Sequence, residues 1–69
     1  MNNPWTMNLA LYQIRKYIND PSYFGSMYVL DNCLLFTNGE KGSYKWYGQN
    51  HIEKVCDNDA MLLVKQAII

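Results

Sequence analysis

The stretch from Cys33 to Tyr47 constrains the fold of this chain most strongly. Two runs rich in aromatic and branched residues, 33–37 and 43–47, flank a short segment that contains an Asn-Gly pair and a further glycine. Strand-forming residues on both sides of a short glycine-containing segment are typical of a β-hairpin. We therefore expect an antiparallel sheet that includes this hairpin.

Both strands of the predicted hairpin carry apolar or aromatic side chains on both faces. Side chains alternate between the faces of a strand, so Tyr44 and Trp46 share one face. Lys45 and Tyr47 share the other face. Because one helix covers only one face of a sheet, function is expected on the uncovered one. That face presents Lys45 and Tyr47 if Trp46 points inward, and otherwise it presents Tyr44 and Trp46.

A helix is expected before the sheet, from about residue 4 to about residue 19. Asn3 and Thr6 are alternative N-caps, and Pro21 ends the helix because proline cannot donate the next backbone hydrogen bond. Apolar residues at spacings of four, three and four predict the stripe of the helix that packs on the sheet. They are Met7, Leu11, Ile14 and Ile18.

Residues 21–26 connect this helix to the first expected strand, residues 27–30. The connector contains Tyr23 and Phe24, whose rings a solvated loop does not need. We expect both rings to form a small cluster under the helix, or else to line a contact surface.

The last third of the chain allows two interpretations. Residues 51–56 and 60–65 are predicted to be strands, with an Asp-Asn-Asp turn at 57–59 between them. The alternative is a second helix over residues 50–66. The expected fold is a single α+β domain spanning residues 1–69, with an N-terminal amphipathic helix packed on an antiparallel sheet of four to five short strands.

Composition narrows the classes of function. The chain has 69 residues, 49% of them hydrophobic, which is enough apolar surface to fold but leaves a thin core, so a homodimer is a possible state. Six basic and six acidic side chains cancel, which excludes a protein-wide field that attracts nucleic acid or an anionic membrane. The sequence shows neither a signal peptide nor a membrane span, and we expect a cytoplasmic protein that does not associate with membranes.

The residues of the chain match no catalytic or cofactor motif. His51 is the only histidine, and the Asp-Asn-Asp run lacks the glycine and glutamate of a calcium-binding loop. No glycine-rich phosphate loop is present. We expect no enzymatic activity, no metal and no cofactor. Cys33 and Cys56 are expected to be buried thiols, with a disulfide or a metal-binding role as the alternatives.

Aromatic rings interleaved with lysines remain as the candidate contact surface. Tyr and Trp are enriched where proteins bind one another, and exposed rings also stack on unpaired bases while lysines hold the nucleic-acid backbone. The competing interpretation is that the Tyr44–Trp46 face is simply core. We predict a small non-enzymatic protein-interaction module, an accessory regulator or inhibitor of a larger protein, of phage or mobile-element origin. The alternative is a single-stranded nucleic-acid-binding protein. The predicted contact residues are Tyr28, Lys41, Tyr44, Lys45, Trp46 and Tyr47.

Overall fold

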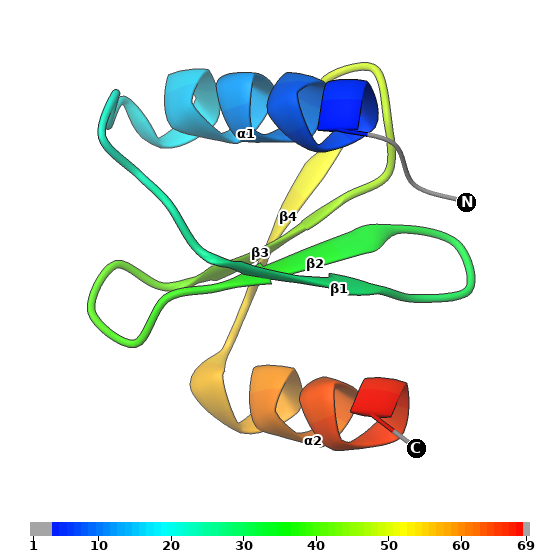
Figure 1. Ribbon diagram of the computed structural model, residues 1–69. Helices are drawn as coiled ribbons and strands as arrows, with labels where there is room; N and C mark the ends of the chain where they lie inside the picture. Colours follow the sequence, from blue (N-terminus) through cyan, green and yellow to red (C-terminus); the bar gives the residue numbers. More distant parts are fainter. Residues whose placement is uncertain (1–3, 69) are drawn as a thin grey trace.

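The predicted α+β fold is confirmed by the computed structural model, which describes residues 4–68 and adds a second helix. A four-stranded antiparallel sheet with strand order β1-β2-β3-β4 lies between two helices, one on each face (Figure 1). Neither helix is both long and apolar enough to cross a membrane within the described residues. In chain order the elements are α1 (Pro4–Ile18), β1 (Ser26–Val29), β2 (Leu34–Thr37), β3 (Ser43–Trp46), β4 (Ile52–Val55) and α2 (Asp57–Ile68).

Helix α1 packs on one face of the sheet and forms the larger part of the core. The predicted stripe is confirmed, because Leu11 and Ile14 are buried and Met7 and Ile18 pack against the same cluster. The helix ends where Asn19 adopts a left-handed conformation (φ 58°), immediately before Asp20-Pro21. Thr6 lies inside α1, and Asn3 lies outside the described residues. The sheet contributes Leu34, Phe36, Tyr44, Trp46 and Ile52 to this core.

The connector between α1 and β1 divides its two rings between core and solvent. Tyr23 is fully buried, its hydroxyl donates a hydrogen bond to the carbonyl of Gly42 (2.9 Å), and its ring meets that of Tyr44 edge-on at 5.6 Å. Phe24 is 62% exposed. The expectation of a core cluster is therefore correct for Tyr23, while Phe24 contributes apolar surface to the outside.

The C-terminal segment is a helix, so the prediction of a strand over residues 60–65 is wrong. The alternative helix over 50–66 also begins too early, because Ile52–Val55 forms β4. Cys56 accepts the first helical hydrogen bond from Ala60, and the Asp-Asn-Asp run is the first turn, where acidic side chains favour the helix dipole. The side chains that face the sheet, at the helical spacing of three and four, are Ala60, Leu63 and Val64.

Alkaline pH is expected to destabilise the fold through Tyr23. Burial raises the pKa of Tyr23 to about 12, above the value of about 10 for a free tyrosine. Between these pH values the folded state holds a proton that the unfolded state has lost, so stability is lost as pH rises. In Tyr23→Phe, the free energy of unfolding should therefore decrease less between pH 10 and about pH 12 than it does in the unmodified protein, as measured by urea denaturation. Tyr12→Phe, at an exposed tyrosine, is the control, and equal slopes for both variants would contradict the prediction.

Candidate functional site

Helix α2 covers the second face of the sheet only in part. The buried side chains on this side are Leu35, Val55 and Ala60, whereas the α1 side buries a larger cluster. Met61 and Leu62 of α2 are both 58% exposed. The helix therefore leaves sheet surface open beside it.

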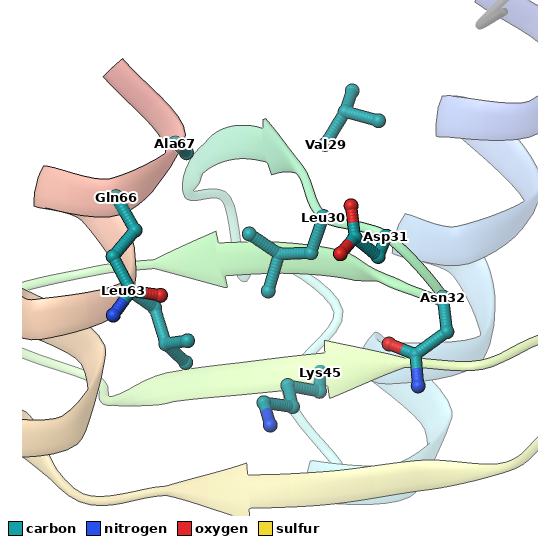
Figure 2. Close-up of a pocket in the computed structure, with 8 residues that line it drawn as sticks. All are labelled: Val29, Leu30, Asp31, Asn32, Lys45, Leu63, Gln66 and Ala67. Carbon is teal, nitrogen blue, oxygen red and sulfur yellow. The ribbon is translucent and has the colours of Figure 1, made fainter. Parts of the chain in front are cut away.

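A cleft of about 450 Å³ opens between the C-terminal half of α2 and the turn that joins β1 to β2. Leu63 and Gln66 come from α2, and the Lys45 side chain lies on β3 between this helix and Asn32 of the turn (Figure 2). A second cleft of about 550 Å³, on the β4 side of α2, is also lined by Lys45, Leu63 and Gln66. Lys45 thus borders both hollows, and the residues that line the first are Val29, Leu30, Asp31, Asn32, Lys45, Leu63, Gln66 and Ala67.

Lys45 is half-buried and has no acidic partner among the described residues. In the register of the sheet it lies directly opposite Leu35 on β2 and Glu53 on β4. The carboxylate of Glu53 instead accepts a hydrogen bond from the hydroxyl of Tyr47 (3.2 Å) and lies 3.8 Å from Nε2 of His51. No ion pair or hydrogen bond of the Lys45 ammonium is found in residues 4–68. A lysine without an acidic partner among the described residues is available to an anionic ligand.

The rings of Tyr47 and His51 lie beside this lysine, with their centroids 4.8 Å apart. Partial burial, together with the hydrogen bond to Glu53, raises the pKa of Tyr47. The carboxylate of Glu53 is thus engaged by Tyr47, and no ion pair joins it to Lys45 within residues 4–68.

The thiols near the cleft are free. Cys33 is half-buried, and burial raises the pKa of its thiol, which disfavours the nucleophilic thiolate at neutral pH. Cys56 is exposed, so the expectation that both thiols are buried is wrong for this residue. Within residues 4–68, no three side chains of the metal-binding types are grouped so that they could hold an ion. The cleft offers the cation of Lys45, the carboxylate of Asp31, amide groups and apolar walls, which are the components of a binding site.

The structure divides five of the six predicted contact residues between the two faces of the sheet. Tyr44 and Trp46 are only 6% and 9% exposed and lie under α1, as the core interpretation states. Lys45 and Tyr47 lie on the opposite face, which is the arrangement expected if Trp46 points inward. Tyr28 lies on the α2 side, half-buried beside the smaller core cluster.

Lys41 has a structural contact away from the cleft. Its ammonium lies 2.8 Å from the carboxylate of Asp20 and donates to the hydroxyl of Ser22 (3.1 Å). It therefore links the β2–β3 turn to the connector after α1. The residues that sequence reasoning missed are the α2 wall, Leu63 and Gln66, and Asn32 in the β1–β2 turn. The sequence signal that could have identified Leu63 and Gln66 was their helical spacing of three residues on α2.

The fold and this site define a small α+β domain in which Lys45, without an acidic partner in residues 4–68, lies on a half-covered sheet face. Comparisons of the chain with protein-family models, with curated proteins and with solved structures found no match.

Proposed function

We propose that this protein is a non-enzymatic protein-interaction module that binds a larger protein as an accessory regulator or inhibitor. The chain is rich in Asn, Tyr, Ile and Lys, the residues of AT-rich codons, which supports the expected phage or mobile-element origin. The free thiols fit a reducing cytoplasm. The observation that carries the proposal is Lys45, a half-buried residue that lies beside apolar side chains of the cleft and whose ammonium has no acidic partner in residues 4–68.

A partner carboxylate flanked by apolar side chains has the chemistry to bind this cleft. The carboxylate pairs with Lys45, while apolar groups pack on Leu30 and Leu63. The side-chain amides of Asn32 and Gln66, which also line the cleft, are suited to hydrogen bonds with peptide groups. Such a cleft favours an acidic side chain or a C-terminal carboxylate of an extended protein segment.

The side chain of Lys45 is already partly covered in the free protein, as a residue of intermediate exposure. Binding a carboxylate beside the apolar side chains that line the cleft therefore adds a charge-assisted contact to apolar packing. The exposed Met61 and Leu62 provide apolar surface on α2 next to the clefts. A central charge with an apolar surround is a common arrangement at protein-binding hot spots.

The single-stranded nucleic-acid alternative depended on exposed rings. Tyr44 and Trp46 are packed under α1, so their ring faces are covered by protein. Base stacking requires open ring faces, and backbone binding requires local positive charge. The net charge of the chain is zero. These observations favour the protein partner.

Lys45→Met is expected to weaken partner binding strongly. We would select displayed random peptides, with free and with blocked C-termini, on the immobilised protein and expect acidic residues or terminal carboxylates next to apolar residues. Titration of the selected peptides should show at least about a 30-fold loss of affinity for Lys45→Met, because removing one member of a buried charge pair costs about 2 kcal/mol or more.

Lys16→Met is the matched control, because it removes the same charge from an exposed lysine of α1. It should bind the peptides as tightly as the unmodified protein does. Selection of peptides without any carboxylate preference, or equal losses for the two variants, would refute the proposed role of the cleft. Circular dichroism of both variants checks that the fold persists.

A further inference from the structure

We propose that the free edge of β1 pairs with β1 of a second copy of this chain and joins the two sheets into one. This interface uses the backbone edge of β1 and does not involve Lys45, although Val29 also lines the Lys45 cleft. It depends on three properties of β1: its place in the sheet, its lack of charge and its self-complementary register.

The sheet order leaves β1 with only one neighbouring strand, β2. The amide of Leu30 donates to the carbonyl of Cys33 (3.0 Å), which sets the alternation of hydrogen bonds along this pair. Hydrogen-bonded and non-hydrogen-bonded residue pairs alternate along an antiparallel ladder. Because Leu30 is hydrogen-bonded to β2, Tyr28, two residues earlier, also directs its backbone N–H and C=O toward β2. Met27 and Val29 direct theirs outward, and no backbone bond from another part of residues 4–68 reaches them.

The two edges of the sheet differ in how they are protected. At the β4 edge, Glu53 and Lys54 stand side by side, and charges of this kind prevent pairing with other chains. The β1 edge, Ser-Met-Tyr-Val, contains neither a charge nor a proline. Its Val29 side chain is 55% exposed. An uncharged edge with an exposed β-branched residue is a template for strand pairing.

A second copy fits this edge through a two-fold axis at Tyr28. Met27 then lies opposite Val29 of the other copy, and their outward N–H and C=O groups form hydrogen bonds in both directions. Met27 and Val29 project to the α1 side, so each exposed valine packs against a methionine. Tyr28 meets its counterpart on the α2 side. Because the net charge is zero, no long-range repulsion opposes the pairing.

The first test is sedimentation of the unmodified chain from micromolar to millimolar concentration, where a monomer–dimer equilibrium is expected. Val29→Lys places a charge on the edge, and Val29→Pro removes an outward N–H that no intrachain bond uses. Both should raise the dimer dissociation constant at least about tenfold. Leu62→Lys, which removes an equally exposed apolar residue of α2, should leave the dimer intact.

Disulfide trapping tests the register itself. In a background with Cys33→Ser and Cys56→Ser, Tyr28→Cys should cross-link on oxidation, because a non-bonded antiparallel pair has its Cα atoms about 4.5 Å apart. Met27→Cys should not cross-link, since it faces Val29 of the other copy. A monomer at all concentrations, loss of the dimer in Leu62→Lys alone, or cross-linking through Met27→Cys in place of Tyr28→Cys would each overturn the proposal.

Discussion

Tyr23→Ala is expected to lower the free energy of unfolding by about 3–5 kcal/mol, which is a large part of the stability of a domain of this size. The side chain is among the largest that are fully buried in the described residues. Its removal leaves a cavity beside Tyr44 and deletes the hydrogen bond to the Gly42 carbonyl. Denaturation by guanidinium chloride, followed by circular dichroism and tryptophan fluorescence, measures the loss.

The neighbouring residue provides the control for Tyr23. Phe24 is also aromatic and in the same connector, yet it is mainly exposed, so Phe24→Ala should change stability by no more than about 0.5 kcal/mol. Tyr23→Phe keeps the ring and should cost only about 1 kcal/mol, for the lost hydrogen bond. Equal losses for Tyr23→Ala and Phe24→Ala would show that the connector does not contribute to the core as described.

Gln13→Met is expected to cost about 1–3 kcal/mol because it leaves a buried donor without an acceptor. The side-chain oxygen of Gln13 accepts hydrogen bonds from Nε1 of Trp46 (2.6 Å) and from the backbone amide of Asn50 (2.7 Å). One residue of α1 thus holds both β3 and the β3–β4 turn. This turn contains left-handed conformations at Gln49 (φ 46°) and Asn50 (φ 65°), which need such support.

Two further variants separate the hydrogen bonds of Gln13 from its packing. Gln13→Glu keeps an oxygen acceptor at the same reach and should retain most of the stability at neutral pH. In a double-mutant cycle, Gln13→Met should cost less when Trp46→Phe has already removed the indole donor. Hydrogen exchange at Asn50 should be faster in Gln13→Met. If the Glu and Met variants are equally destabilised, acceptance by Gln13 is not the source of the effect.

The unequal cores of the two helices are related to the proposed function. The larger buried cluster lies under α1, and α2 is held by a smaller one. A helix with few buried contacts opens or shifts at a lower free energy than the rest of a domain. The α2 side therefore combines the clefts, the unpaired lysine and the more adaptable helix, while the α1 side holds the sheet in shape.

The sequence by itself determined the elements whose patterns have one interpretation. A four-three-four stripe ended by Asp20-Pro21 is compatible only with a helix that stops there, and α1 begins and ends within a residue of the expected positions. The aromatic runs around Asn38-Gly39 similarly defined β2 and β3. Alternation also divided the site correctly, with Lys45 and Tyr47 opposite Tyr44 and Trp46.

Only the tertiary structure decided whether the C-terminal segment forms a strand or a helix, and which face of the sheet carries the site. The apolar run at 60–65 is short enough to form either a strand or a helical turn, and its helical form buries Leu63 and Val64 against a sheet face that α1 cannot reach. Which aromatic pair becomes core depends on the face that α1 occupies, a long-range contact that no local pattern records. The contacts of Glu53 have the same origin, because Tyr47 and His51 lie beside it only when β3 and β4 are paired.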